Sequence, residues 1–246
     1  MTINRRNSQE SVEPFEGAEI LKMADSSTGS KMMSVVDLTV KPGTTSAYHR
    51  HPNTEESIFV VEGDVEFRVG NHKFKASPGD CILAPKGVGH GLANIGNIDA
   101  RFICGYPNAN PLREEISEPE FKFNNPSKNV FIREKNDHFE FYPGISRYDM
   151  VGDFLGAEST YFSELTFSPG SIAANHYHPA HEESMFCLEG NLTAVYDNDN
   201  SIDLQAGDIF TCEIGIRHGI YNNSKDVAKL LAFHPVLNPP PRIDVD

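Results

Sequence analysis

Two histidines separated by a single residue, His49 and His51, are followed five residues later by Glu56. In a β-strand, residues i and i+2 point to the same side, so the two imidazoles can lie next to each other. A carboxylate on a neighbouring strand can complete the group. Imidazole and carboxylate ligands together suit Fe, Mn, Ni, Cu or Zn, so this segment predicts a divalent metal site.

The same arrangement occurs a second time, 127 positions further along, at His176, His178 and Glu183. A second block, which contains His90 in the first copy and His218 in the second, repeats at an offset of 128 residues. A nearly constant internal period indicates a duplicated structural unit. The chain is therefore predicted to contain two similar domains, each with its own candidate site.

These blocks resemble the two sequence motifs of the cupin family. The first motif is Gly, His-x-His, Glu and Gly, and both halves match it in full. The second is Gly, Pro-x-Gly, His and Asn, which the first half matches in full and the second half matches except for Glu213 in place of Pro. The resemblance covers residues 33–108 and 158–236. It implies an all-β fold of two tandem cupin double-stranded β-helix barrels, also called jelly rolls.

By the family's pattern, each barrel holds one divalent transition metal between three imidazoles and one carboxylate. Fe(II) is favoured, with Mn, Ni, Cu and Zn as alternatives, because the ligand set alone does not select the metal. Glu56 and Glu183 are preferred over the adjacent Glu55 and Glu182 because they fit the family's spacing to the closing glycine. Four protein ligands on an octahedral ion leave two positions for substrate or O₂. The implied ligands are His49, His51, Glu56 and His90 in the first half, and His176, His178, Glu183 and His218 in the second.

Short strands must position these side chains. Runs of β-forming residues broken by Gly, Pro, Asn or Asp follow one another through both halves, which is typical of a sandwich or barrel. We expect an N-terminal arm or short edge strand over residues 1–32, a first cupin domain over 33–110, a connector with some short elements over 111–150, and a second cupin domain over 151–246. The proline-rich tail after Asn238 cannot join a central strand and is expected to be extended.

Composition restricts the partners and the location. Of the 246 residues, 39% are hydrophobic and 23% are charged, as in ordinary globular chains. A formal net charge of −14 argues against nucleic acid or an anionic membrane surface as a partner. The polar N-terminus does not resemble a signal peptide, and no apolar run approaches the roughly 20 residues that span a bilayer. The cytoplasm is the predicted location, and the four cysteines, which form no CxxC pair, are expected to be buried free thiols.

Assembly follows from the resemblance and from strand parity. The two barrels are expected to pack through sheet faces around a pseudo-twofold axis. The chains are expected to pair again into a homodimer, because outward-facing Phe59, Val61 and Phe186 would otherwise expose apolar surface.

Strand parity also predicts the surroundings of the metals. The residues expected to face the cavities are Ala47, Ile58, Val60, Ala174, Met185 and Cys187, which would make the pockets apolar. An equally weighted alternative is that these residues only fill the barrel cores. An exposed loop position is preferred for His181 over a role in supporting the metal ligands, and His72, His138 and His234 are interpreted as ordinary histidines.

The leading functional hypothesis is a metal-dependent oxidoreductase, a quercetinase-like dioxygenase that holds O₂ and a small aromatic or carbonyl-bearing substrate on the metal. The alternatives are a non-redox isomerase, lyase or decarboxylase, and a bicupin that binds a small molecule without turnover. The catalytic candidates are Glu56, Glu183 and Glu213. Glu213 is a candidate general base if it faces inward and a structural residue if it faces outward. The first half, which matches both motifs, is favoured as the catalytic one.

Overall fold

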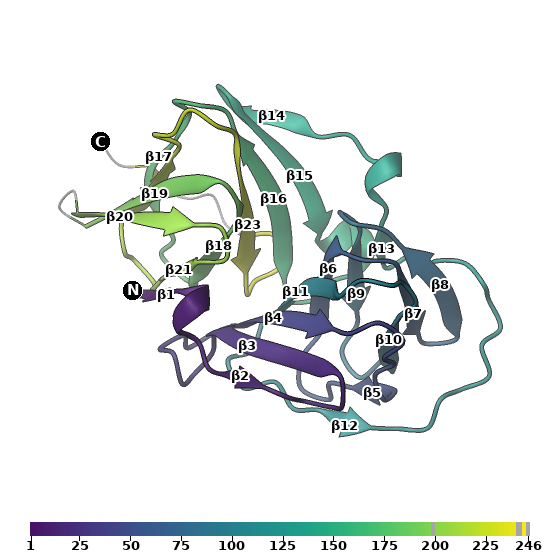
Figure 1. Ribbon diagram of the computed structural model, residues 1–246. Coiled ribbons are helices and arrows are strands. Elements are labelled where there is room, and N and C mark those ends of the chain that lie inside the picture. Colours follow the sequence, from purple (N-terminus) through teal and green to yellow (C-terminus); the bar gives the residue numbers. More distant parts are fainter. Residues whose placement is uncertain (198–199, 240–242, 245–246) are drawn as a thin grey trace.

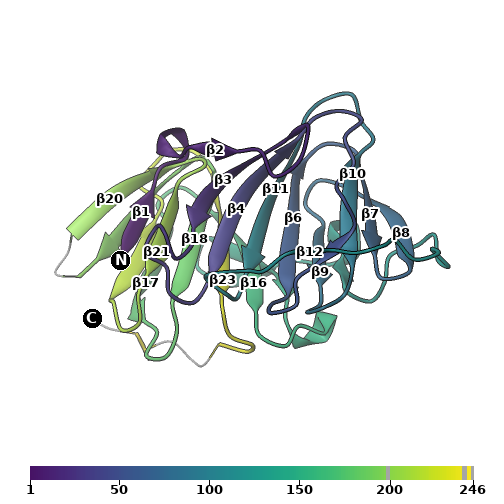
Figure 2. The same ribbon diagram turned by 90° about the horizontal axis from the view of Figure 1, so that it is seen from below.

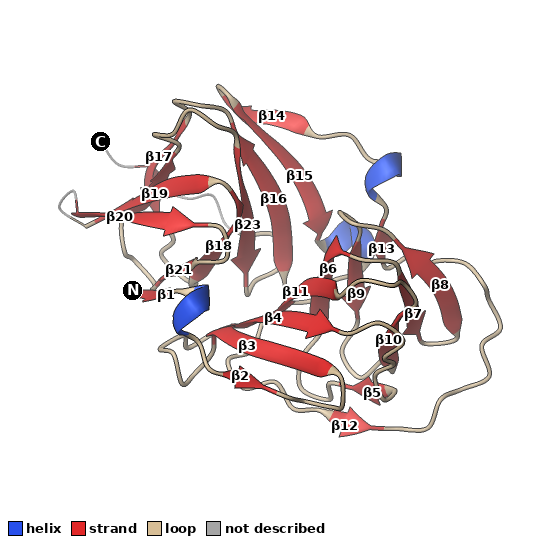
Figure 3. Cartoon of the chain, viewed as in Figure 1, coloured by secondary structure: helices blue, strands red, loops and turns tan. Residues whose placement is uncertain are grey.

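The structure is a computed structural model that describes residues 1–197, 200–239 and 243–244. Its regular structure is almost entirely β, and the described part contains three short 3₁₀ helices, η1 (Arg6–Ser8), η2 (Arg133–Lys135) and η3 (Asp153–Leu155) (Figure 3). The strands form two barrels that lie side by side, each made of a seven-stranded and a five-stranded sheet (Figure 1). The predicted all-β fold with two jelly-roll barrels is confirmed.

The first barrel has its metal-ligand motifs in residues 49–90. Its seven-stranded sheet has the order β13 (Val130–Phe131), β9 (Cys81–Ala84), β6 (Glu56–Glu62), β11 (Ala100–Tyr106), β4 (Ser34–Val40), β3 (Ala18–Ala24), β2 (Ser11–Val12). Its five-stranded sheet has the order β12 (Glu114–Glu115), β5 (His49–Arg50), β10 (His90–Asn94), β7 (Val65–Val69), β8 (His72–Ala76).

The second barrel repeats this order strand for strand. Its seven-stranded sheet is β1 (Thr2–Asn4), β21 (Ile209–Cys212), β18 (Glu183–Glu189), β23 (Ala228–His234), β16 (Tyr161–Phe167), β15 (Ile145–Val151), β14 (Phe139–Tyr142). Its five-stranded sheet is β24 (Ile243–Asp244), β17 (Ile172–Tyr177), β22 (His218–Tyr221), β19 (Asn191–Tyr196), β20 (Asn200–Gln205).

The turn after the first motif requires a glycine for geometric reasons. Gly63 lies in the turn between β6 and β7 with φ +102°, a conformation that residues with a side chain rarely adopt. A Cβ built there would lie 2.8 Å from the Ala100 Cα on the neighbouring strand β11. Gly190 occupies the same place in the second barrel with φ +75°, against Ala228. The tight turn fixes the register of β6 and β18, the strands that begin with the ligating carboxylates.

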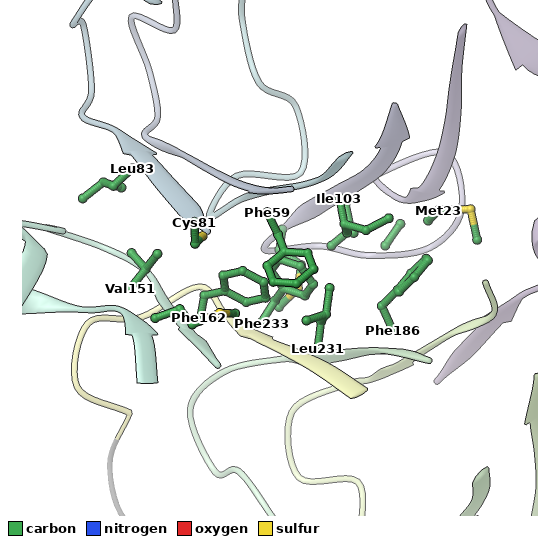
Figure 4. Packing of buried hydrophobic residues seen from close by; sticks show 14 of the residues in the cluster. Met23, Phe59, Cys81, Leu83, Ile103, Val151, Phe162, Phe186, Leu231 and Phe233 are labelled. Carbon is green, nitrogen blue, oxygen red and sulfur yellow. The ribbon is translucent and has the colours of Figure 1, made fainter. Parts of the chain in front are cut away.

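The two seven-stranded sheets pack against each other through one hydrophobic cluster with members from both barrels. Phe59 on β6 and its counterpart Phe186 on β18 are 2% and 0% exposed, and Val61 packs against the same cluster. Figure 4 shows Phe59 beside Phe162, Phe233 and Leu231, with Phe186 further along the same layer. These side chains are therefore covered within one chain, and the expectation that they need a second chain to cover them is wrong. The homodimer itself stays a prediction.

The N-terminal residues do not form a separate arm. Strand β1 pairs with β21 at the edge of the second barrel, whereas β3 is an interior strand of the first barrel's sheet, between β2 and β4. Figure 2 shows β1 lying next to β21 while the following purple strands cross to the first barrel (Figure 2). The N-terminal segment thus adds an edge strand to the second barrel before it forms two strands of the first.

The segment predicted as a connector repeats this exchange in the opposite direction. Strand β13 pairs with β9 of the first barrel, whereas β14 and β15 extend the sheet of the second. In the proline-rich tail, β24 adds an edge strand beside β17. Residues 240–242 and 245–246 of that tail lie outside the described residues. Each half of the sequence therefore contributes its first strand to the other half's barrel.

Candidate metal centres

The four predicted ligands of the first barrel lie together where β5, β6 and β10 meet. His49 in β5 pairs in antiparallel register with His90, the first residue of β10, and Glu56 is the first residue of β6. The Glu56 Oε2 atom lies 3.0 Å from His51 Nε2 and 2.8 Å from His90 Nε2. One ligand atom from each of the four side chains lies within 4.8 Å of the other three.

The second barrel brings its four predicted ligands together in the same way. His176 in β17 pairs with His218, the first residue of β22. The Glu183 Oε2 atom lies 2.8 Å from His178 Nε2, 2.9 Å from His218 Nε2 and 3.6 Å from His176 Nε2. These four side chains also place their ligand atoms within 4.8 Å of one another.

The arrangement of these donors fits a metal ion. In the first barrel, Nδ1–H groups donate to backbone carbonyls and leave Nε2 as the ligand atom. The pairs are His49 with Ala47 (3.0 Å), His51 with Leu112 (2.6 Å) and His90 with Val88 (3.1 Å). Metal–ligand bonds of about 2.1 Å at right angles put adjacent ligand atoms about 3 Å apart, which matches the 2.8–3.0 Å between the imidazoles and Glu56. The residues present therefore fit a divalent ion with three nitrogen ligands and one oxygen ligand.

Both carboxylates are poised to be ionised. Burial by itself would raise the pKa of Glu56, but hydrogen bonds from His51 and His90 hold that pKa well below its usual value. Glu183 is also buried, and the nearby His234, His176, His178 and His218 hold its pKa well below the usual value. An anionic oxygen at the centre of a histidine cluster is the electrostatic requirement for holding a cation.

The carboxylates that precede the ligands have a different task. Glu55 accepts hydrogen bonds from Ser159 N (2.8 Å), Ser159 Oγ (3.1 Å) and Glu158 N (3.0 Å) of the second barrel. Glu182 makes the reciprocal contact with the first barrel, accepting from Ser30 Oγ (2.9 Å), Lys31 N (3.0 Å) and Met32 N (2.9 Å). In each Glu-Glu pair, the second residue faces its own metal cluster and the first binds the loop of the other barrel. We call this reciprocal contact the clasp.

Glu213, a candidate catalytic residue, does not face the second metal cluster. Its carboxylate pairs with Lys31 Nζ at 2.5 Å and with the N-terminal ammonium of Met1. Both cations hold its pKa down, to about 2. The general-base role is therefore not supported, and the residue fits the outward, structural alternative. The physical reason is that the exchanged strand β1 delivers a positive terminus to this turn.

Two histidines that the sequence did not mark as functional lie beside the second cluster. His181 is 0% exposed, so the expectation of an exposed loop position is wrong. His234 Nε2 lies 3.6 Å from Glu183 Oε1, and His234 Nδ1 lies 3.2 Å from His181 Nε2. Burial lowers the pKa of His181 to about 4 and that of His234 to about 3. His181 occupies a variable position inside the first motif and His234 lies outside both motifs, but a comparison of the two repeats could have singled out both.

In the first barrel, the positions equivalent to these histidines hold Thr54 and Tyr106. Tyr106 Oη donates a hydrogen bond of 2.7 Å to Glu56 Oε1, the oxygen that is not directed at the histidines. The same oxygen of the carboxylate is thus approached by a phenol in one barrel and by an imidazole in the other. The metal clusters are alike, and the groups behind them differ.

A cavity of about 390 Å³ opens onto the first metal cluster. Most of its wall is apolar. The apolar lining includes Ile20, Val36, Leu38, Ile58 and Leu92. The charged side chains Lys22 and Arg113 also line it, paired with Asp25 at 3.5 Å and Glu115 at 2.9 Å. The predicted apolar character of the pocket describes this barrel well.

A cavity of about 470 Å³ opens onto the second cluster, and its wall is also mainly apolar, with Leu165, Phe167 and Met185 among the lining residues. Arg147 on β15 stands where the first barrel has Ile20, and Tyr161 on β16 stands where it has Ser34. Arg147 Nε lies 2.6 Å from Asp149 Oδ1, and its Nη2 lies 2.9 Å from Tyr161 Oη. The guanidinium also stacks over Phe141, 4.4 Å from the ring centre. A positioned cation therefore shares a cavity with the second metal cluster.

The structure places only some of the predicted cavity residues at the cavity walls. Ile58 and Met185 line the two cavities, as strand parity predicts. Cys187 is buried in the core of the second barrel instead, and burial raises the pKa of its thiol to about 12. Ala47 and Ala174 contribute carbonyl groups that orient His49 and His176. Strand alternation itself is kept, because Met185 and Cys187 both belong to the core of the second barrel while Phe186 packs in the layer between the barrels. Cys187 lies further along β18 from Glu183, and it fills the barrel core and does not line the cavity.

Comparison with known proteins identifies the family. The model of the cupin domain matches residues 36–106 and, separately, residues 163–234. The chain belongs to the cupin family. With one such domain in each barrel, this cupin is a bicupin, and its two histidine–glutamate clusters are the metal-binding clusters of the two domains.

Relatives of known sequence and neighbours of known structure are also similar to this chain. The chain is 31% identical over 86 residues to an uncharacterized protein of Methanocaldococcus jannaschii. The aligned region covers 35% of this chain and 66% of that protein. A solved oxalate decarboxylase of Lactobacillus farciminis, in complex with formate, superposes with a TM-score of 0.82 at 16% identity, covering 100% of this chain and 88% of that one. An oxalate decarboxylase of Bacillus subtilis described with Mn(II) centres has a TM-score of 0.80 at 14% identity, covering 100% and 79%. At this identity, the likeness to the two enzymes establishes the fold.

Among the described residues, no helix is long and apolar enough to cross a membrane.

Proposed function

We propose that this bicupin is a metal-dependent lyase of the decarboxylase type, which acts on a small carboxylate in the second barrel. One observation carries the proposal: the Arg147 guanidinium lines the same cavity as His176, His178 and Glu183. A planar guanidinium matches a carboxylate group in geometry and charge. The solved neighbours described as oxalate decarboxylases, one with bound formate, support small carboxylates as the substrate class by analogy of fold.

Arg147 is held ready for this task. Asp149 and Tyr161 take two of its five N–H groups, and they are the acceptors that the described residues provide. Stacking over Phe141 fixes the plane of the guanidinium. An incoming carboxylate can therefore bind the remaining N–H groups without reorganisation of the side chain, which favours tight binding.

The cluster residues His176, His178, Glu183 and His218 would hold a divalent metal, for which we propose Mn(II) in preference to Fe(II) because a solved neighbour is described with Mn(II) centres. Such an ion supplies Lewis-acid polarisation of a substrate oxygen. Arg147 would bind and orient the substrate carboxylate. Tyr161 would supply the proton that replaces CO₂, since burial raises its pKa and keeps the phenol protonated at neutral pH.

The test is an assay of the metal-loaded protein against oxalate and a panel of 2-oxo acids, with CO₂ release and O₂ uptake measured together. We expect CO₂ release without stoichiometric O₂ uptake. Arg147→Gln should raise KM about 10- to 100-fold, because hydrogen bonds to charged groups contribute about 1.5–3 kcal/mol. Arg113→Gln, a cation lining the other cavity, is the matched control and should leave KM unchanged. Equal effects of the two substitutions would contradict the assignment to the second barrel.

An O₂-dependent reaction in the first barrel is the second candidate. The observation that favours it is the group of aliphatic side chains in the wall of that cavity, Ile20, Val36, Leu38, Ile58 and Leu92, which suits an aromatic substrate. A dioxygenase consumes one O₂ for each substrate molecule, so the same measurement distinguishes the two reactions. Stoichiometric O₂ uptake with flavonols or catechols, abolished by Glu56→Gln and retained in Glu183→Gln, would replace the first proposal.

A further inference from the structure

Three histidines of the second barrel form a cluster of their own behind the metal ligands. His178, His181 and His234 place one ring nitrogen each within 4.8 Å of the others. His181 Nε2 and His234 Nδ1 are 3.2 Å apart and share a hydrogen bond when no ion lies between them. That distance is close to the roughly 3 Å expected between adjacent ligand atoms of one ion with bonds of about 2.1 Å.

The ring geometry of this trio matches that of the metal cluster next to it. Ring centres in the trio are 4.5 Å (His178–His181), 5.2 Å (His178–His234) and 5.3 Å (His181–His234) apart. The three histidines of the adjacent cluster, His176, His178 and His218, have ring centres 4.3–5.6 Å apart. The distances between ring centres in the trio are therefore compatible with a set of metal ligands.

Two buried nitrogen atoms in the trio, His178 Nδ1 and His181 Nδ1, have no hydrogen-bond partner among the described residues. His178 Nδ1 is the one that bears on a second ligand set, because His181 directs its other nitrogen, Nε2, at His234. In the first barrel, the equivalent His51 Nδ1 donates to the Leu112 carbonyl at 2.6 Å. A buried polar group without a partner is disfavoured, so the second barrel differs at the nitrogen that its metal cluster leaves unused.

We infer that His178, His181 and His234 bind a second divalent cation in the second barrel. His178 would be shared, with Nε2 directed at the known cluster and Nδ1 at the new ion. Three imidazoles without a carboxylate suit Zn²⁺, Co²⁺, Ni²⁺ or Cu²⁺ better than Mn²⁺. Sharing requires that His178 release its Nδ1 proton to solvent, which leaves a bridging imidazolate whose negative charge lies between the two cations.

The inference is specific to one barrel and does not depend on the proposed reaction. The first barrel has Thr54 and Tyr106 in place of His181 and His234, and neither is an imidazole. The protein therefore contains its own control arrangement. Because the two folds are equivalent, the exchange His181→Thr with His234→Tyr gives the second barrel side chains that the first already accommodates.

The experiment is a Co²⁺ titration of the full-length, tag-free protein after removal of bound metal. Wild type should bind about three tight equivalents, whereas the His181→Thr/His234→Tyr variant should bind about two. Thr54→Ala, at the matched position of the first barrel, should retain all three. Two tight equivalents in wild type, or three in the exchanged variant, would overturn the inference.

Electron paramagnetic resonance of the Co²⁺-loaded wild type gives a second readout that needs no variant. Two ions that share an imidazolate couple magnetically, so the signal of the second barrel should be attenuated while that of the first persists. Two independent, full-intensity Co²⁺ signals at saturation would overturn the inference even if the exchanged variant failed to fold.

Discussion

In the first barrel, Glu56 is approached by two ligand histidines and by the phenol of Tyr106, whereas in the second barrel Glu183 is approached by ligand histidines and by His234. Each cavity has a cation in a mainly apolar wall. In the first cavity Arg113 pairs with the exposed Glu115, whereas in the second Arg147 is held by Asp149 and Tyr161. After duplication, the ligands kept their types and spacing, because every ligand must reach the same ion. The residues of the cavity walls and those that contact the ligating carboxylates from behind need not reach the ion, so they differ between the barrels.

Removing metal ligands in matched pairs should have the largest effect. His49→Ala with His90→Ala should weaken metal binding in the first barrel by more than about 100-fold, since loss of an outer partner alone costs about 10- to 100-fold. His176→Ala with His218→Ala should do the same in the second barrel and also abolish decarboxylation. Metal content by mass spectrometry and CO₂ release are the measurements.

Both variants should remain folded, because each barrel has a core cluster of its own. Circular dichroism provides that control. Loss of decarboxylation only in the His49→Ala/His90→Ala protein would reverse the proposed division of labour between the barrels.

Breaking the clasp should lower stability by similar amounts from either side. Glu55→Gln and Glu182→Gln each replace a buried anion that accepts three hydrogen bonds from the other barrel. We expect each to reduce the free energy of unfolding by about 1.5–3 kcal/mol. For a chain of this size, the melting temperature should fall by about 2–4 °C per kcal/mol.

Differential scanning calorimetry measures this effect, and Glu115→Gln, an exposed carboxylate, is the control. A melting temperature for either clasp variant equal to that of the control would show that the contact does not stabilise the interface.

Tyr106→Phe tests the residue that supports the first metal cluster. The substitution removes the 2.7 Å hydrogen bond to Glu56 Oε1 and keeps the ring. We expect metal affinity in the first barrel to fall about 10-fold, at the lower end of the range for outer partners. Affinity in the second barrel should not change, and competition with a chromophoric chelator can separate the two. An unchanged affinity in both barrels would assign Tyr106 a purely packing role.

The smallest expected effect is the pH dependence of the Glu213 contact with Lys31 and the N-terminus. Its pKa is lowered from 4.5 to about 2 in the folded chain, so the contact contributes fully above pH 4.5 and is lost as the pH falls towards 2. The melting temperature of wild type should exceed that of Glu213→Gln slightly at pH 6, and the difference should vanish near pH 2. Because the carboxylate is partly exposed, salt should reduce the difference. A difference that grows on acidification would have the wrong sign for this contact.

The sequence by itself determined the duplication, the two-barrel fold and the identity of the residues that form the two clusters. Those properties depend on local spacing: alternate residues of a strand share a face, and a positive-φ glycine closes the turn after each ligating strand. The spacing to that glycine also separated Glu56 and Glu183 from the adjacent carboxylates, which the structure assigns to the clasp.

Only the tertiary structure decided what surrounds the metals and how the barrels are joined. His234, Arg147 and Tyr106 lie outside the motifs, and they reach the metal clusters because β23, β15 and β11 lie in the same sheets as the strands of Glu183 and Glu56. The exchange of β1 and β13 between barrels turned Glu213 towards a terminal ammonium, and the packing of the seven-stranded sheets covered Phe59 and Phe186. Contacts between distant segments carry no local signature, because their cost and gain arise only when the chain has closed on itself.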